Sequence, residues 1–364
     1  MIIAVDGYEI GAVSTGVGRV IHNLVMEMSS FLPHQFLVVT RQRISDFADR
    51  PNIRSKVVPC PGGYFRWQNL TLRRELKKSK WDLFIAPNYT LPLGFRGPAV
   101  LLEHDISFVT HPGWFTRKEA VKKKFLVGRS LKNASLIMTV SHFSRREILD
   151  CFPVAPGKIH VVHHGVENKF QPVSRGEVLK WKADNGFGDK KMIGFLGSIF
   201  NRRRLPLLVE AVEKVRDRIP VGLHIVGKDM TCPPQDMKSL LNRPWIRWDQ
   251  ELPDHHLPVF YSSLDVFAYL SEYEGFGLPP LEALSCETLP VLLNRTALAE
   301  IYPGIAVMVD QPKVDPVAAA LISALTDENM RRSKMECFQR RRNYFTWKRA
   351  AEEWTACMEP LLEG

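Results

Sequence analysis

Short apolar runs alternate with helical stretches along the whole chain, and this alternation occurs twice. The first series of strand-like runs lies at residues 2–6, 36–40, 82–86, 99–103, 136–140 and 159–162. The second series lies at residues 192–196, 223–226, 265–270, 290–293 and 306–309. Apolar strands that alternate with helices are typical of parallel sheets buried on both faces. The pattern predicts an α/β protein with two Rossmann-like domains that face each other across a cleft.

The length agrees with two domains. A chain of 364 residues is too long for one compact core and suits two domains of about 150 residues or more. The segment 167–190 is polar, carries proline and glycine, and separates the two series. We therefore expect the first domain to end at residue 168.

The composition disfavours several classes of protein. No apolar run approaches the roughly 18 residues that a membrane-spanning helix needs. The N-terminus has no basic region before its first strand, so we expect no secretory signal. The six cysteines are scattered and form no CxxC pair, which disfavours a disulfide scaffold or a zinc ribbon. These features predict a cytoplasmic protein.

The net charge of +10 is concentrated in the first half of the chain. Residues 1–168 contain 23 Lys and Arg and 13 Asp and Glu, whereas the remaining residues contain 26 of each sign. Such an asymmetry suggests an anionic partner, either nucleic acid, phospholipid headgroups or a phosphorylated substrate. The two densest basic clusters lie at residues 66–81 and 117–129 and include aromatic side chains.

A glycine-rich turn follows the first strand-like run of each half. The first turn, at residues 11–19, includes Gly16 and Gly18 and opens into an amphipathic helix. Glycine allows the backbone to approach a phosphate, although the same pattern also fits a tight turn without a ligand. A third glycine and an acidic residue after the next strand are missing, which disfavours a nicotinamide dinucleotide.

The second turn begins at Gly197 and continues into Arg202, Arg203 and Arg204. Arginine side chains at the end of a strand can bind a diphosphate through paired hydrogen bonds. A run of solvated charges is the alternative. The position favours binding, because ligands of open α/β sheets lie beyond the carboxyl ends of the strands.

The most specific segment runs from residue 271 to residue 283. It places Glu274 on a loop and Glu282 inside a helix that prolines begin, with a Gly-Phe-Gly turn between them. Here the sequence resembles the family-4 retaining glycosyltransferases, which have the two-domain GT-B fold and a Glu-x7-Glu signature within EGFGLPxLEA. The resemblance covers nearly the whole chain. Further matching segments lie at residues 14–19, 103–112, 140–144, 197–204 and 345–347.

The resemblance implies a role for each matching residue. Glu274 would contact donor-sugar hydroxyls, Glu282 would bind the nucleotide ribose, and His104 would contact the donor sugar. Arg202 and Arg203 would hold the diphosphate without a metal or another cofactor. Backbone N–H groups would meet the sugar and phosphate, and these belong to Gly275, Phe276, Gly277 and Leu278. The final helix, residues 347–364, would return to the first domain, and residues 169–346 would form the nucleotide-sugar domain.

The chain departs from the family pattern at four places. Arg203 stands where lysine is usual, and His164 replaces the asparagine of an Asn-Gly-Val sequence. Glu287 stands where glycine is usual, and a glycine expected near Asp249 is absent. These changes affect the fit of the nucleotide more than the catalytic charge.

The resemblance implies transfer of a hexose, most similar to mannose from GDP-mannose, to a saccharide or lipid-linked saccharide in cell-surface polysaccharide synthesis. UDP- and dTDP-sugars remain open. Two alternatives are a nucleotide-sugar 2-epimerase and a non-catalytic protein that binds nucleotide sugars. The neutral second half and the lack of a recognised module argue against nucleic acid. The basic clusters instead suit the inner face of an anionic membrane, although a solvated helix is also compatible with them.

Overall fold

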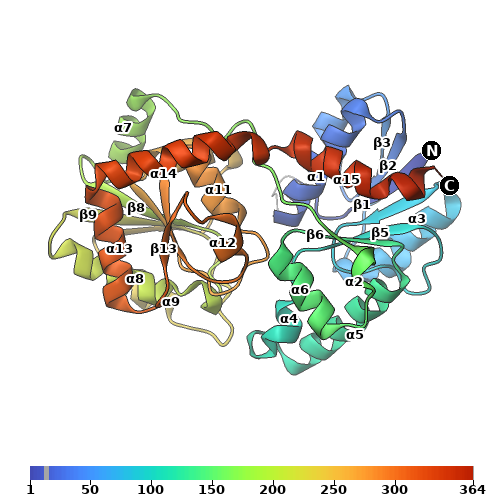
Figure 1. Cartoon of the computed structure of the whole chain (residues 1–364), viewed down its shortest axis with the longest axis horizontal. Helices are drawn as coiled ribbons and strands as arrows, with labels where there is room; N and C mark the ends of the chain where they lie inside the picture. Colours follow the sequence, from blue (N-terminus) through green and yellow to red (C-terminus); the bar gives the residue numbers. More distant parts are fainter. Residues whose placement is uncertain (12–15, 364) are drawn as a thin grey trace. The chain divides into compact units, whose positions relative to one another are not determined.

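The strands of each series run parallel to one another in a sheet of their own. The computed structural model describes residues 1–11 and 16–363. It divides into unit 1, Met1–Gly165 with Tyr344–Gly364, and unit 2, Val166–Asn343 (Figure 1). The expected limits, 168 and 347, each lie three residues further along the chain. The α/β class with two Rossmann-like domains is confirmed.

Unit 1 contains a seven-stranded sheet in the order β3-β2-β1-β4-β5-β6-β7. Its strands are β1 Ile2–Gly7, β2 Gln35–Thr40, β3 Ile53–Val57, β4 Leu83–Ala86, β5 Ala99–Glu103, β6 Leu136–Thr139 and β7 Ile159–Val161. Its helices are α1 Gly16–Phe31, α2 Tyr64–Arg66, α3 Arg73–Lys78, α4 Ser107–Thr110, α5 Arg117–Asn133, α6 His142–Cys151 and α15 Trp347–Leu362. Helices cover the sheet, as the apolar composition of its strands requires.

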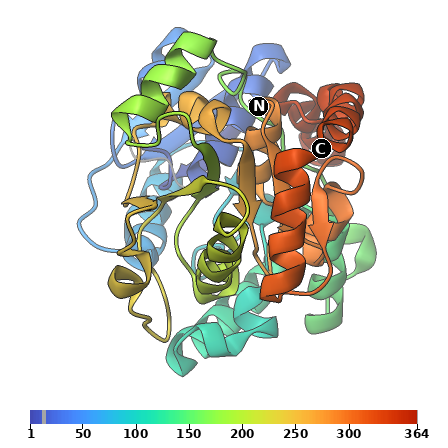
Figure 2. The same ribbon diagram turned by 90° about the vertical axis from the view of Figure 1, so that its left-hand side faces the viewer.

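Unit 2 contains a six-stranded sheet in the order β10-β9-β8-β11-β12-β13. Its strands are β8 Lys191–Leu196, β9 Val221–Val226, β10 Ile246–Asp249, β11 Val266–Tyr269, β12 Leu289–Leu293 and β13 Val307–Val309. Its helices are α7 Arg175–Asp184, α8 Leu205–Arg216, α9 Met237–Leu241, α10 Leu257–Ser263, α11 Leu278–Ser285, α12 Thr296–Ile301, α13 Val314–Thr326 and α14 Glu328–Arg341. Figure 2 turns this unit toward the viewer, with α13 beside α8.

The sequence analysis missed two strands, β3 and β10, and both lie at an edge of a sheet. Their sequences are IRSKV and IRWD, and most of their residues are half-buried or exposed. An edge strand pairs on one side only and tolerates charge, so it has no continuous apolar run to reveal it. The segment 167–190, within which we expected the break between the domains, belongs to unit 2 and contains α7.

The final helix, α15, belongs to unit 1 and packs along α1. Its buried residues are Trp347, Ala350, Ala351, Trp354 and Met358, which recur at helical spacing and form one face. Gly165, the last residue of the first part of unit 1, lies against the start of this helix. A Cβ atom on Gly165 would lie 2.2 Å from the backbone nitrogen of Trp347, so this approach requires glycine.

Each sheet reverses its strand order at one point. In unit 1 this point lies between β1 and β4, and in unit 2 it lies between β8 and β11. Ligands of open α/β sheets bind beyond the carboxyl ends of the strands at such a point. No helix formed by the described residues is long and apolar enough to cross a membrane.

Candidate active site

The loops that follow β8 and β11 meet at the point of reversal in unit 2. The two strands are parallel neighbours, with Val266 opposite Ile193, so their carboxyl ends lie side by side. The loop after β8 carries Gly197 and the three arginines. The loop after β11 carries Glu274. The order of the strands alone therefore brings together two segments that the sequence analysis singled out, residues 197–204 and residues 271–283.

Arg203 crosses the first of these loops and reaches Glu274. Its Nη1 donates to the carbonyl oxygen of Ser198 at 2.8 Å, and its Nε donates to Oε1 of Glu274 at 3.2 Å. The guanidinium lies over Gly197, where a Cβ atom would come within 2.3 Å of Nη1. Gly197 also has a φ of 131°, a conformation that favours glycine. The glycine therefore makes room for the arginine side chain.

Three donors converge on one oxygen of Glu274. Besides Arg203, the hydroxyl groups of Tyr269 and Ser271 each donate to Oε1 at 2.8 Å. Among the described residues, none of the hydrogen bonds to this side chain reaches Oε2. The backbone N–H of Glu274 donates to Oγ1 of Thr296 at 3.2 Å. The carboxylate is thus held in one orientation with its second oxygen available to a ligand.

The surroundings of Glu274 favour its charged form. Burial alone raises the pKa of this carboxyl, but the charges of Arg203 and Arg202 outweigh that effect. Hydrogen bonds from Tyr269 and Ser271 act in the same direction, and the pKa lies below its ordinary value. Glu274 is therefore an anion at neutral pH.

Glu272 ties the two loops together at a second place. Its backbone N–H donates to the carbonyl oxygen of Arg202 at 2.9 Å, and its Oε1 accepts from Nη2 of Arg204 at 2.5 Å. Arg204 has a φ of 49°, which turns the chain from the loop into α8. Arg204 thus serves loop geometry, whereas the Arg202 guanidinium lies 4.3 Å from the ring centre of Phe200.

The Gly-Phe-Gly turn leads into α11. Gly277 has a φ of 90°, and a Cβ atom there would lie 2.8 Å from Cδ2 of Leu298. The hydroxyl of Tyr302 donates a hydrogen bond to the carbonyl oxygen of Gly277 and stabilises the turn. Gly275 and Phe276 are buried, and half-buried Leu278 is the first residue of the helix. The amino end of α11 and the Glu274 carboxylate therefore belong to one rigid turn.

Glu282 comes eight residues after Glu274 in the sequence. It is in the middle of α11, is 1% exposed, and accepts a hydrogen bond at Oε2 from the hydroxyl of Tyr261 at 2.7 Å. In this structure its observed partner is a core tyrosine. Its expected contact with a ribose stays a prediction.

His104 follows β5 in unit 1. Its Nε2 lies 3.1 Å from the carbonyl oxygen of Pro87, which can only accept, so Nε2 carries the proton and Nδ1 can accept a hydrogen bond. Burial lowers the pKa of His104 to about 4, so the ring is neutral. Its ring centre lies 6.0 Å from that of His164, which in turn lies 5.4 Å from that of Trp347.

The first glycine loop is described only in part. Gly16 is exposed at the start of α1, and Gly18 is buried within its first turn. Residues 12–15, which include Ser14 of the matching segment, lie outside the described residues. Among the residues that are described, no group of three or more His, Cys, Asp or Glu side chains could hold a metal ion.

Two family models match the chain, one in each half. The model for family-4 glycosyltransferases matches residues 14–170, and the model for group 1 glycosyl transferases matches residues 178–337. The chain is also 30% identical to O-antigen chain mannosyltransferase B of Escherichia coli over 261 residues, which cover 70% of this chain and 68% of that protein. The chain belongs to the family-4 glycosyltransferases.

Other relatives of this glycosyltransferase agree with that assignment. It is 29% identical to an MMP alpha-(1->4)-mannosyltransferase of Mycolicibacterium hassiacum, over 62% of this chain and 54% of that protein. Its fold is similar to that of Anabaena HepE solved with UDP and glucose, with a TM-score of 0.78, 15% identity, and coverage of 99% and 100%. WaaG, a glycosyltransferase of lipopolysaccharide biosynthesis, gives a TM-score of 0.74 at 14% identity and 98% coverage of both chains. The GT-B fold is confirmed, and the epimerase alternative gains no support.

Four residues of the glycosyltransferase site were missed by the sequence analysis, namely Tyr269, Ser271, Thr296 and Tyr302. Each holds Glu274 or Gly277 in place. Thr296 has a φ of 51°, which is rare for a β-branched residue and is a sign of strain of the kind that clusters at functional sites. Tyr269 could have been found from its position as the last residue of β11, directly before the motif.

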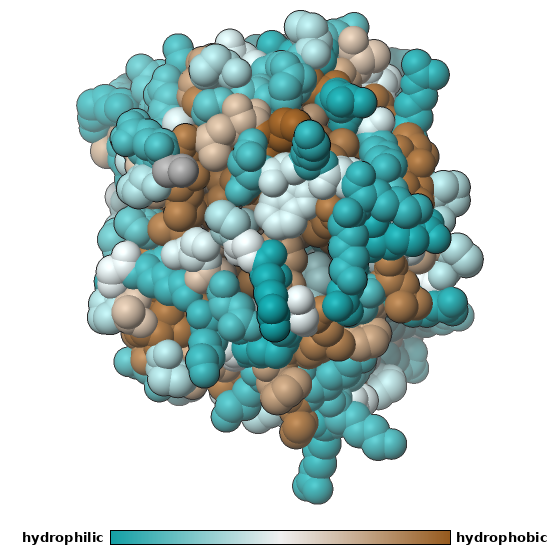
Figure 3. Space-filling view, turned by 90° about the vertical axis from the view of Figure 1, so that its right-hand side faces the viewer, coloured by the Kyte–Doolittle hydropathy of each residue, from teal (hydrophilic) through white to brown (hydrophobic). Residues whose placement is uncertain are grey.

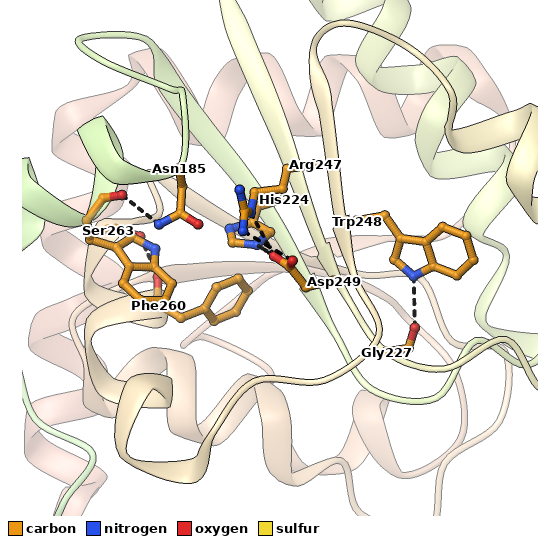
Figure 4. Close-up of polar contacts among 9 residues, drawn as sticks. Asn185, His224, Gly227, Arg247, Trp248, Asp249, Phe260 and Ser263 are labelled. Carbon is orange, nitrogen blue, oxygen red and sulfur yellow. Dashed lines mark hydrogen bonds and ion pairs between the residues drawn. The ribbon is translucent and has the colours of Figure 1, made fainter.

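Two departures from the family pattern have a structural explanation. Asp249 accepts hydrogen bonds from Arg247 at 2.7 Å and pairs with Nε2 of His224 at 2.8 Å, and Figure 4 shows both side chains directed at it. Its side chain therefore links the end of β10 to the middle of β9. Glu287 has a φ of 62° directly after α11, so the glycine usual in the family fits the backbone better there.

Proposed function

We propose that this glycosyltransferase moves a hexosyl unit from a nucleotide-diphosphate sugar to an acceptor hydroxyl and retains the anomeric configuration. The orientation of Glu274 carries this proposal, since its hydrogen bonds from described residues all end on Oε1 and Oε2 is available for hydroxyl groups of the donor sugar. Arg202 and Arg203 would bind the diphosphate and stabilise the charge that develops on the leaving phosphate.

Retention would proceed without a covalent intermediate. Retaining glycosidases use two carboxylates about 5–5.5 Å apart, one of them a nucleophile. Here Glu274 is paired with Arg203, and Glu282 is bound to Tyr261 in the core. Attack on the same face of the sugar, assisted by the leaving phosphate, is the alternative that needs no protein nucleophile. The neutral His104 would accept a hydrogen bond from the sugar at Nδ1.

We assign mannose from GDP-mannose as the donor and a saccharide or lipid-linked saccharide as the acceptor. Both relatives reported above are named as mannosyltransferases, and the name of one refers to an O-antigen chain. HepE was solved with UDP, so the base needs a direct test. A thermal-shift screen with GDP, UDP, dTDP and ADP should give the largest increase in Tm with GDP, because a ligand that binds the folded state stabilises it. A larger increase with another nucleotide would overturn this donor.

Variants at Glu274 and Arg202 test the reaction itself. Glu274→Ala and Arg202→Ala should abolish transfer from GDP-mannose while the circular dichroism spectrum stays unchanged. The matched controls are Glu210→Ala and Arg218→Ala, which remove the same charges from exposed positions in unit 2. Normal transfer by either site variant would contradict the assignment. Because arginines supply the positive charge, the rate should be the same with and without EDTA.

We also assign an anionic membrane surface as the place of transfer. The exposed large apolar side chains of unit 1 include Phe65 at 43%, Val121 at 71% and Phe125 at 68%. Val121 and Phe125 lie one turn apart on α5, and Nζ of Lys122 lies 4.2 Å from the ring centre of Phe65, so α2 and α5 adjoin. We call these three residues the α5 patch.

The charge around the α5 patch is positive. Helix α5 carries Glu119 as its one acidic residue and seven basic residues, namely Arg117, Lys118, Lys122, Lys123, Lys124, Arg129 and Lys132. Figure 3 shows apolar side chains among long hydrophilic ones at its lower end, the level at which Figure 1 places α5. Each basic residue near an anionic surface contributes about 1 kcal/mol, and each buried large apolar side chain about 1.5–3 kcal/mol.

Sedimentation with liposomes tests this surface. The protein should pellet with vesicles that contain phosphatidylglycerol, more at low salt than at physiological salt. Val121→Ser with Phe125→Ser should abolish pelleting. The control is Leu179→Ser with Met230→Ser, which removes apolar side chains that are 50% and 53% exposed in unit 2. Equal pelleting by both double variants would exclude the α5 patch, and no pelleting of the wild type would exclude the membrane.

A further inference from the structure

A basic hollow lies at the amino edge of the unit 1 sheet, where β1, β2 and β3 begin. It has a volume of about 610 Å³, in the range of small-molecule sites. Its lining includes the apolar residues Ile2, Phe36 and Leu37, together with the end of α3 and the turn that follows. We call it the amino-edge pocket. His104 follows the carboxyl end of β5, so the pocket and the candidate active site lie at opposite edges of the sheet.

Four cations line the amino-edge pocket. Arg54 and Lys56 come from β3, and Lys78 and Lys80 come from the end of α3 and the turn after it. No carboxylate is among its lining residues. Lysine on an edge strand also discourages strand pairing, and that explains Arg54 and Lys56. It does not explain why two more cations from another element converge on the same hollow.

Among the four cations, Lys56 is the one that forms an ion pair with a described carboxylate. Nζ of Lys56 lies 2.6 Å from Oε2 of Glu75, a side chain that is 6% exposed. The hydrogen bond from Lys56 is the main cause that lowers the pKa of Glu75, so this carboxylate is charged. No described carboxylate lies within ion-pair distance of Arg54, Lys78 or Lys80. Asp82, which follows the turn after α3, is not among the lining residues and accepts a hydrogen bond from the N–H of Ile2 at 2.7 Å.

Three cations without a carboxylate partner among the described residues, together with Ser79 in the lining, form the chemistry of a phosphate site. A ligand with a single carboxylate would leave most of the positive charge of Arg54, Lys78 and Lys80 uncompensated. We propose that the amino-edge pocket binds a ligand that carries at least two phosphate groups. The ligand is either a soluble diphosphate or the headgroup of a membrane lipid. This proposal does not depend on the proposed transfer reaction, because its residues belong to neither loop of the candidate active site.

The direct test is titration calorimetry with inorganic pyrophosphate. Pyrophosphate can also occupy the diphosphate position proposed in unit 2, so the full-length chain should be used in an Arg202→Ala background. We expect saturable binding, weakened by salt, with much weaker binding of inorganic phosphate. Lys78→Ala with Lys80→Ala should weaken the pyrophosphate Kd by about tenfold or more, since two charge-assisted hydrogen bonds to the phosphate groups are lost.

A charge-matched variant controls for loss of net charge. Arg96→Ala with Arg146→Ala removes two positive charges from exposed positions in the same unit and should leave the Kd unchanged. Lys78→Arg with Lys80→Arg keeps the charge and should bind nearly as well as the background chain. Equal loss in the two alanine variants would show attraction to net charge alone and would overturn the proposal. Absence of pyrophosphate binding, together with absence of the vesicle binding described next, would also overturn it.

Vesicles distinguish the two sources of the phosphate groups. One set contains phosphatidylinositol bisphosphate and the other contains phosphatidylglycerol at equal total charge. If the pocket binds a lipid headgroup, the protein should prefer the bisphosphate vesicles, and Lys78→Ala with Lys80→Ala should abolish this preference. A site for a soluble diphosphate predicts pyrophosphate binding without that preference. The exposed α5 patch would attract both vesicle sets alike, so the comparison separates it from the amino-edge pocket.

Discussion

Arg203 donates from Nε to Oε1 of Glu274 across 3.2 Å, and both side chains are only 12% exposed. The residues lie 71 positions apart and meet because β8 and β11 are neighbours in the sheet. In such a sheltered position each charge depends on the other, since an unpaired buried charge is costly. The same contact that orients the carboxylate therefore also stabilises the fold of unit 2.

A double-mutant cycle measures this coupling. Arg203→Met and Glu274→Gln should each lower the free energy of unfolding by about 1–3 kcal/mol, because each leaves its partner without a counter-charge. The double variant should lose less than the sum of the two. Urea unfolding gives the three values. The exposed pair Lys180 and Asp184, at 76% and 58% exposure, should show coupling close to zero. Strict additivity at residues 203 and 274 would contradict the coupling.

Because of Glu103, we expect the stability of the protein to depend on pH in an unusual way. It is fully buried, neither carboxylate oxygen has a hydrogen-bond partner among the described residues, and burial raises its pKa well above 4.5. The folded state keeps the proton that the unfolded state releases above about pH 4.5, so stability falls as pH rises. Glu103→Gln should therefore be more stable than the wild type at pH 8, and the difference should vanish near pH 4.

The control for Glu103 is a glutamate with the opposite shift. Hydrogen bonds from the side chain and backbone of Thr116 lower the pKa of Glu119, which closes the capping box of α5. Its contribution is present above the unfolded pKa and is lost as pH falls. Glu119→Gln should therefore give no gain at pH 8. Urea unfolding of both variants from pH 4 to pH 8 makes the comparison, and a gain of equal size in both would refute the burial argument.

His104 should stay neutral in the range where most histidines titrate. Burial lowers its pKa to about 4, below the ordinary 6.5, so the folded state binds its proton only in acid. The stabilisation that this group contributes is present above pH 6.5 and is lost as pH falls toward 4. An NMR titration, with the His104 signal assigned from its absence in His104→Gln, should show no midpoint between pH 5 and pH 8. A midpoint near 6.5 would mean that the ring is solvated.

Much of the fold could be predicted because interior strands are apolar runs, and parallel sheets need helices between them. The edge strands β3 and β10 could not be predicted, since residues such as Arg54 and Arg247 interrupt their apolar character. Motif residues such as Glu274 and Arg203 could be predicted as candidates from their spacing. The supporting contact from Thr296 could not be predicted, because Thr296 lies 22 residues away and reaches Glu274 only through the adjacency of two loops.

Glu287 offers a gain in stability. Its φ of 62° is left-handed, which costs a side-chain-bearing residue about 1–2 kcal/mol, whereas glycine adopts it freely. After the entropy cost of glycine, Glu287→Gly should raise the free energy of unfolding by about 0.5–1 kcal/mol. The same substitution at exposed Glu210, inside right-handed α8, should instead lower it by about 1 kcal/mol. Denaturation midpoints compare the two, and a loss at residue 287 would refute the backbone explanation.

Gly197 tests whether the arginine position, rather than loop stability, governs transfer. Gly197→Ala places a Cβ atom 2.3 Å from Nη1 of Arg203 at a φ of 131°, so the guanidinium must move away from Glu274. Gly304 also has a positive φ, 83°, but a Cβ atom there would meet nothing within 4 Å. Both alanine variants should lose about 1 kcal/mol or more of stability from backbone strain. Only Gly197→Ala should also lose transfer, by about 100-fold, because the misplaced charge no longer stabilises the leaving phosphate. Initial rates at a temperature where both variants are folded decide the matter, and equal rates in the two would show that the arginine position does not limit transfer.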